Sequence, residues 1–148
     1  MPGYTERFTE VNQPTGELYP ALKSVGAHNG AWISMANHQR VVFLVMVGAM
    51  TALSTLDFKI QEDTDGDGGD AQDISGKAIT QLTQAGGDGN DLLAVEVRTD
   101  ELDVADGYCY VRGVLTVGTD TVYCAMLPLR FIPNYPPVVT TGWTEIVD

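Results

Sequence analysis

The chain has 148 residues, of which 44% are hydrophobic and 19% charged, so it suffices for one packed domain and is too apolar for a disordered acidic tail. Its 20 acidic residues and 8 Lys or Arg residues give a formal net charge of −12. No two basic residues are adjacent, whereas affinity for nucleic acid or for an anionic membrane depends on clustered basic side chains. The composition argues against both partners and permits a protein partner.

The chain carries no targeting signal that we detect and only two cysteines. Its first residues, MPGYTER, do not place an apolar stretch after a basic one, which predicts no secretory signal. The longest uncharged run, 41–56, is shorter than the roughly 20 apolar residues of a membrane-spanning helix. We interpret Cys109 and Cys124 as small buried side chains in a reducing compartment; a disulfide between them is the alternative.

Residues 1–25 are predicted to form an N-terminal arm. Prolines and glycines interrupt the segment, yet it carries large apolar side chains that a solvated tail does not need. At about 3.3 Å per extended residue, the arm would reach well past a domain whose radius of gyration is about 13 Å. We therefore expect the arm to become ordered against another surface. Its large apolar residues are Tyr4, Phe8, Val11, Leu18, Tyr19 and Leu22.

Residues 26–132 are predicted to form a β-sandwich. The stretch 31–35 reads as a short strand that carries Trp32 into the core. The stretch 41–47 is apolar at odd and even positions, which predicts a central strand buried on both faces. The stretch 56–61 alternates apolar and polar residues, which predicts a half-buried strand.

The second half of this domain continues the pattern. Residues 93–98 alternate again, and 108–117 predicts a further strand. A tight turn at 118–120 predicts a hairpin whose partner strand is 121–131. Within that partner, Pro128 lacks a backbone donor and predicts an edge or a bulge.

Residues 133–148 are predicted to form a C-terminal arm. Consecutive prolines favour an extended backbone there, and Trp143 is expected to anchor the segment to a surface. Six or seven short strands without a clear helix predict an all-β fold. We therefore expect a single antiparallel β-sandwich, resembling a jelly roll, with extended N- and C-terminal arms.

An acidic, glycine-rich loop spans 63–73. Asp63, Asp65, Asp67 and Gly68 match positions 1, 3, 5 and 6 of a calcium loop, but the twelfth position is Ile74 where a bidentate carboxylate is needed. We predict no resident metal ion, and the candidate ligands of a weakly held cation are Asp63, Asp65 and Asp67. The alternative is a solvated loop between strands.

No motif for catalysis or for a cofactor is present in the sequence. Residues 86–94 fit a single copy of the calcium-binding nonapeptide, which has no second copy to complete its ion shell. His28 and His38 do not have a metal-ligand spacing, and there is no nucleophile elbow, P-loop or dinucleotide fingerprint. We predict a non-enzymatic protein without a cofactor; a hydrolase with carboxylates assembled across loops is the alternative.

Aromatic residues and Arg are enriched at protein interfaces. Tyr108, Tyr110 and Arg112 share one face of a predicted strand, which is either a contact patch or an ordinary outer sheet face. Together with residues of the two arms, the candidate partner-contact residues are Tyr4, Phe8, Leu18, Tyr19, Tyr108, Tyr110, Arg112 and Trp143.

The order of these features resembles the small virion structural proteins of tailed bacteriophages, of the head-decoration or cement type, over about residues 24–133. The features are Ser34-Met35 with Asn37, the apolar strand, Leu56-Asp57-Phe58-Lys59-Ile60-Gln61, the Gly/Asp loop, Glu101-Leu102-Asp103-Val104-Ala105-Asp106-Gly107-Tyr108, and a hairpin near Gly118. The resemblance implies a β-sandwich, a homo-oligomer with a trimer favoured, and contact with the major capsid protein. It implies no particular site residues.

We therefore expect a capsid decoration or cement protein that staples major capsid protein subunits in a virion assembled in the host cytoplasm. Alternatives are a structural component of the neck or tail, or a calcium-dependent β-sandwich module that binds carbohydrate or a host surface. The hydrolase is the enzymatic alternative.

Overall fold

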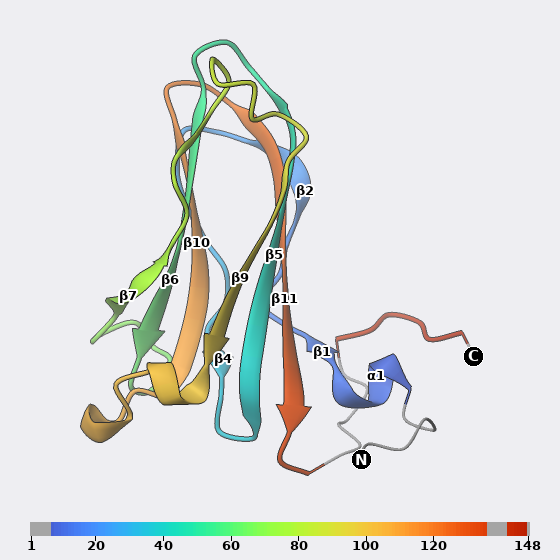
Figure 1. The fold of residues 1–148 in the computed structure, drawn as a ribbon, viewed down its shortest axis with the longest axis vertical. Coiled ribbons are helices and arrows are strands. Elements are labelled where there is room, and N and C mark those ends of the chain that lie inside the picture. The colour runs from blue at the N-terminus through green and yellow to red at the C-terminus, as the bar shows by residue number, and fades with distance from the viewer. Residues whose placement is uncertain (1–6, 136–141, 148) are drawn as a thin grey trace.

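The computed structural model of the chain describes residues 7–135 and 142–147. Their strands form two antiparallel sheets that face each other, so the predicted β-sandwich is confirmed (Figure 1). Sheet A has the order β1-β11-β5-β9, with β2 also paired to β11, and contains β1 (Gln13–Pro14), β2 (Leu18–Lys23), β5 (His38–Met50), β9 (Leu92–Arg98) and β11 (Val122–Pro133).

Sheet B has the order β3-β10-β6-β7, with β4 also paired to β10 and β8 to β6. Its strands are β3 (Gly26–Asn29), β4 (Ile33–Ser34), β6 (Thr55–Asp63), β7 (Gln72–Ala78), β8 (Leu82–Thr83) and β10 (Tyr110–Gly118). The helices of the described residues are all short: α1 (Phe8–Val11), η1 (Thr99–Glu101) and η2 (Val104–Asp106). Within the described part of the chain, no helix has the length and apolar character needed to cross a membrane.

The hydrophobic core lies between the sheets because successive side chains of a strand point to opposite faces. On β6, Leu56, Phe58 and Ile60 are buried, as their alternation predicts. Across the sandwich, the ring of Phe43 on β5 lies 5.8 Å from that of Phe58, centroid to centroid. The predicted inward face of 56–61 is therefore confirmed.

The sheets approach closely at Gly113 on β10. A Cβ atom at this position would lie 2.8 Å from a ring atom of Phe58, 3.0 Å from one of Phe43, and closer still to Met126 of β11. Gly113 therefore admits these three large side chains to the centre of the core.

The central strand β5 differs from its prediction. Its inward residues are buried, but outward Val42 and Leu44 are half-buried and Met46 is 60% exposed. The prediction of burial on both faces is wrong, because an apolar run does not specify which surface covers its second face. That surface is only partly supplied by the described residues.

The turn at Gly118–Asp120 also differs from its prediction, because it does not close a hairpin. β10 pairs with β3, β4 and β6 in sheet B, whereas β11 pairs with β5, β1 and β2 in sheet A. The turn therefore carries the chain from one sheet to the other. A turn sequence determines where the chain reverses, while the neighbours of each strand depend on which sheet buries its inner face.

Pro128 lies within an interior strand, so its prediction as an edge marker is wrong. It faces Phe43 of β5 on one side. On the other side, β11 pairs with β2 as far as Met126 and with β1 from Leu129 onward. Pro128 falls in the gap between these partners, where its carbonyl accepts the Thr15 N–H at 3.3 Å. A missing donor is tolerated in such a gap.

The structure places the expected N-terminal arm differently. Residues 13–14 and 18–23 are strands β1 and β2, which pair with β11 of the same chain. Pairing satisfies the backbone groups of these residues that face β11, and Leu18 packs against the core. Of the expected C-terminal arm, residues 142–147 lie beside α1, and 136–141 are outside the described residues (Figure 1).

One lysine bridges the two sheets along the side formed by β7 and β9. Lys77 of β7 donates its Nζ to the Glu96 carbonyl of β9 at 2.8 Å, and the same atom lies 2.9 Å from the Glu101 carboxylate. β9 is the outermost strand of sheet A on this side. The Lys77 ammonium group therefore occupies one backbone acceptor on the unpaired edge of β9.

Candidate protein-binding surface

The outer side of sheet A presents a continuous apolar surface. The strand registers align its side chains in rows: Met46 of β5 lies opposite Ala125 of β11 and Leu92 of β9, and Leu44 opposite Leu127. Nothing in the described residues buries these rows completely. We call this surface the apolar face, and its members are Tyr19, Leu22, Val42, Leu44, Met46, Leu92, Tyr123, Ala125 and Leu127.

The most exposed members of the apolar face are large. Tyr19 is 73% exposed, Leu92 68% and Tyr123 51%. Scattered exposed leucines are ordinary on a protein surface, but a contiguous patch of large apolar side chains marks an interaction site. The apolar face is therefore the strongest candidate for a binding surface.

The face is hollowed along β11. Two adjoining grooves, of about 290 Å³ and about 220 Å³, share Pro20, Met46 and Ala125 in their linings. Ala125 is the smallest of these shared residues and lies directly opposite Met46 of β5. The face can therefore receive a projecting side chain.

Charged side chains lie at the borders of the apolar face: Glu96 of β9 is opposite Val42, and Glu17 lines one end of a groove. Neither 41–50 of β5 nor 122–129 of β11 contains a charged residue. At one end of the face, Arg40 Nη1 lies 3.1 Å from Glu96 Oε1. At the N-terminal end of β2, the Tyr19 hydroxyl donates to Glu17 Oε1 at 3.1 Å. A neutral centre with a polar rim is the usual composition of a protein interface.

A second, smaller patch lies on the outer side of sheet B. The guanidinium carbon of Arg112 lies 4.4 Å from the ring centroid of Trp32, and Nε and Nη2 donate to Gln61 Oε1 at 3.0 and 2.8 Å. Trp32 is half-buried here, so its predicted place in the core is wrong. The neighbouring Ile33 points inward in its place, since successive strand residues alternate.

The two tyrosines expected beside Arg112 hold the acidic loop instead of forming an open patch with it. The Tyr108 hydroxyl donates to the Asp70 carbonyl at 3.3 Å. The half-buried ring of Tyr110 lies close to Gly66, where a Cβ atom would be 2.8 Å from it. The three residues therefore do not form one patch: Tyr108 and Tyr110 contact the acidic loop, whereas Arg112 contacts Trp32 and Gln61.

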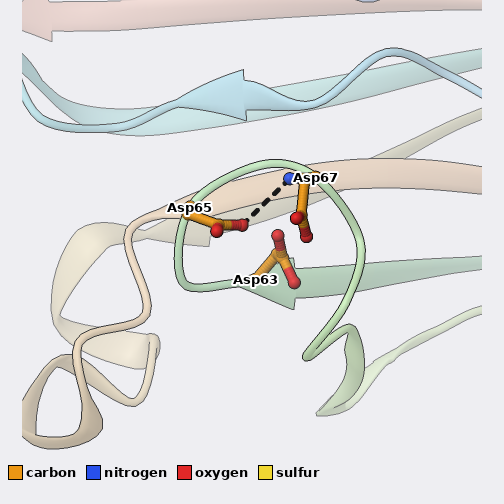
Figure 2. A group of neighbouring side chains, drawn as sticks. All are labelled: Asp63, Asp65 and Asp67. Atoms are coloured by element: carbon orange, nitrogen blue, oxygen red, sulfur yellow. Dashed lines mark hydrogen bonds between the residues drawn. The ribbon is translucent and has the colours of Figure 1, made fainter.

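The acidic loop gathers the three predicted carboxylates. Asp63, Asp65 and Asp67 each offer an oxygen within 4.8 Å of the others, and their side chains converge inside the loop (Figure 2). Asp63 is buried, whereas Asp65 and Asp67 are exposed. The twelfth position of the calcium-loop alignment, Ile74, is buried in the core and supplies no ligand.

The carboxylates of the loop accept backbone hydrogen bonds. Asp63 Oδ2 accepts from the N–H groups of Gly66 and Gly68 at 2.7 and 3.0 Å, and Oδ1 accepts from Asp70 at 3.2 Å. Asp65 accepts from the N–H of Asp67 at 3.0 Å (Figure 2). Burial acts to raise the pKa of Asp63, but the three backbone bonds together outweigh it and lower the pKa. The first role of Asp63 is therefore to fix the loop.

The remaining candidate residues lie near the chain ends. Phe8 is 58% exposed and its ring meets that of Trp143, so Trp143 anchors to its own chain. Leu18 packs against the core, while Tyr19 belongs to the apolar face. Tyr4 lies outside the described residues. Cys109 and Cys124 are free; Cys124 is buried, as interpreted, whereas Cys109 is only half-buried.

Sequence reasoning missed most of the apolar face. Met46, Leu92, Tyr123 and Leu127 are absent from the predicted contact residues, although Leu92 directly precedes the predicted strand 93–98 and Tyr123 lies within the predicted strand 121–131. The signal was present in the apolar residues at both parities of 41–47. We interpreted that signal as burial within the domain, whereas the outward half of it forms part of the surface.

No family model matches the chain, and no curated protein matches it. Among solved structures, the chain is similar to a chain in the cryo-EM atomic structure of broad bean stain virus, with a TM-score of 0.44 and 11% sequence identity. The alignment covers 99% of this chain and 97% of that chain. Similarity at this level carries no functional information, so function is inferred from the surface itself.

Proposed function

We propose that this protein is a non-enzymatic structural subunit that binds other protein subunits through the apolar face. The observation that carries the proposal is the exposure of large apolar side chains across β2, β11, β5 and β9, with no charged residue in 41–50 of β5 or 122–129 of β11. Such a surface favours burial against protein, because the hydrophobic effect rewards removal of apolar area from water. Clustered basic residues, which nucleic acid would require, are absent from the sequence.

The assembly in question is, we further propose, a virion. The sequence resemblance to tailed-phage structural proteins supports a capsid decoration or cement protein that joins neighbouring major capsid protein subunits. The Trp32–Arg112 patch on sheet B provides a second contact surface on the opposite side of the sandwich. A subunit with two such surfaces is suited to linking neighbours.

The test uses phage heads purified without this protein. Wild-type protein should bind the heads and raise the temperature at which they release DNA. A variant with Met46→Glu and Leu127→Glu should bind less, because it places two charges in the apolar face. The matched control is Val104→Glu, which changes an exposed apolar residue of η2, away from sheet A.

Equal head binding by the apolar-face variant and wild type would contradict the proposed use of that surface. Equal heat resistance of heads with and without bound protein would contradict the cement role. The number of copies per particle separates a decoration protein from a neck or tail component, since a decoration protein covers the head and a neck component forms one ring.

A further inference from the structure

The size of the apolar face suits a stable protein interface. Its six most exposed large side chains keep between 39% and 73% of their surface in solvent. Taking about 150–200 Å² for a large side chain, they expose roughly 600 Å². A standard interface buries about 800 Å² on each partner, and the four of these side chains that lie on β11, β5 and β9 supply roughly 400 Å², about half of one side. The six side chains are Tyr19, Leu22, Met46, Leu92, Tyr123 and Leu127.

The chemistry of the face limits its occupant. The centre of the face on β5 and β11 carries no charge, and Glu17 and the Arg40–Glu96 pair lie at its borders, so the surface that covers the centre should also be neutral and apolar. This chain itself carries a surface of that composition. We propose that a second copy of this chain covers the apolar face, with the two A sheets packed back to back about a twofold axis. The inference rests on the proposed function and names the subunit that the apolar face binds; contact with the major capsid protein is then made by the Trp32–Arg112 patch of sheet B.

The strand registers define a self-complementary arrangement. Ala125, Met46 and Leu92 form one row across β11, β5 and β9, with neighbouring strands about 4.8 Å apart. A twofold axis that runs along β5 above Met46 places β9 of one copy over β11 of the other, while Tyr19 and Leu22 of β2 extend past the border of the mate's β9. Each Leu92 then lies above the groove over Ala125 in its mate, and the contact repeats as symmetry requires.

The same axis determines which charges of the two copies approach each other. Arg40 lies on β5 near the axis at one end of the face, and its ion pair with Glu96 reduces its repulsion from the Arg40 of the second copy. The acidic loop belongs to the turn between β6 and β7 of sheet B, so the back-to-back arrangement keeps the two loops apart. Each copy nevertheless carries a net charge of −12, so added salt should strengthen the association by screening.

The first experiment measures the mass of the intact protein in solution by sedimentation and light scattering, from about 1 µM to about 1 mM. We expect a mass twice the 15.9 kDa of one chain, which falls toward the monomer on dilution. Met46→Glu should weaken the association about 30-fold or more, as at an interface hot spot. Val104→Glu carries the same added charge and should leave the association unchanged.

The second experiment tests the register. Ala125→Phe should weaken the association because its ring fills the groove that receives Leu92 of the mate. Adding Leu92→Ala to the same chain should restore the association, because the introduced ring then has room above the shortened side chain. Cooperative thermal unfolding of each variant verifies that it folds. Recovery of the association in the double variant would show that Leu92 of one copy contacts the groove over Ala125 of the other, and that the Ala125→Phe effect was not a loss of folding.

Wild-type protein that is monomeric throughout, or trimeric as the sequence resemblance favours, would overturn the twofold pair. So would a dimer that Met46→Glu leaves intact. A monomer that binds heads only while Met46 is unchanged would refute the second copy and leave the proposed function standing. A monomer that binds heads equally well with and without Met46→Glu would refute both the twofold dimer and the proposed use of the apolar face.

Discussion

The ring of Trp143 meets the ring of Phe8 edge to face, with their centroids 6.2 Å apart and their planes at 64°. The contact joins a residue near the start of the chain to one near its end. Aromatic pairs in this geometry contribute about 0.5–1.5 kcal/mol beyond the area they bury. The chain ends thus stabilise one another, although the sequence predicted two separate arms.

Replacing Trp143 with Ala should therefore lower the free energy of unfolding by about 1–3 kcal/mol, through loss of the ring contact and of buried area. Urea denaturation measures the change. Tyr135→Ala is the control, because Tyr135 is 81% exposed and its loss should change stability by less than about 0.5 kcal/mol. Equal stability of the Trp143 variant and wild type would show that the ends do not support each other.

His38 should make folding sensitive to acid. It is 5% exposed, and neither of its ring nitrogens has a hydrogen-bond partner among the described residues. Burial, and secondarily the charge of Arg130, lowers the pKa of His38 to about 4. The unfolded chain, with a His pKa of about 6.5, binds a proton first as the pH falls. Stability contributed by neutral His38 is full above about pH 6.5 and is lost as the pH falls toward 4.

The size of this effect is up to about 3 kcal/mol, from about 1.4 kcal/mol for each pH unit between the two pKa values. The measurement is the free energy of unfolding of wild type minus that of His38→Leu, from pH 7 to pH 4, so that contributions of the carboxylates cancel. We expect the difference to fall with pH. His28→Gln should leave the pH dependence as it is in wild type, and a flat difference for His38→Leu would contradict the burial argument.

Asp63 and Asp65 should differ in their effect on the loop. Asp63→Asn weakens three backbone hydrogen bonds at a buried carboxylate, whereas Asp65→Asn affects one at an exposed carboxylate. We expect a clearly larger fall in melting temperature for the Asp63 variant. Both are measured in a chelator, so that bound cations do not contribute. A larger fall for Asp65→Asn would contradict the structural role of Asp63.

Gly113 should not tolerate a side chain. Gly113→Ala places a Cβ atom against Phe58, Phe43 and Met126. Such overpacking costs about 1–3 kcal/mol, measurable by urea denaturation. Gly89→Ala is the matched control, because the nearest atom to its Cβ would lie at 3.6 Å. Equal effects of the two substitutions would show that the core accommodates the extra methyl group.

The sequence identified the fold class because strand periodicity is a local property. The alternation of 56–61 assigned Leu56, Phe58 and Ile60 to the core, and the structure confirms it. The clustering of the loop carboxylates was predictable for the same reason, since only one residue separates each from the next. Features that depend on one element meeting another were harder to predict, because distant segments decide them.

The partner of β11 and the exposure of β5 are examples of such features. The turn at 118–120 looked like a hairpin because reversal of the chain has a sequence signature and the choice of neighbouring strand has none. Met46 looked buried because its hydrophobicity is the same whether its own domain or another chain covers it. Residues 18–23 looked like an arm because a strand at a sheet border carries a weaker apolar alternation than a central one.

The lysine at the border of sheet A has a consequence for growth of the assembly. An edge strand with unpaired backbone groups can pair with a strand of another chain, and repeated pairing of this kind leads to open-ended polymerisation. At β9 this edge is partly filled by the Nζ of Lys77, which already binds the Glu96 carbonyl. Strand-by-strand polymerisation into fibrils is thereby discouraged on this border, and contacts that finish after a fixed number of chains are favoured.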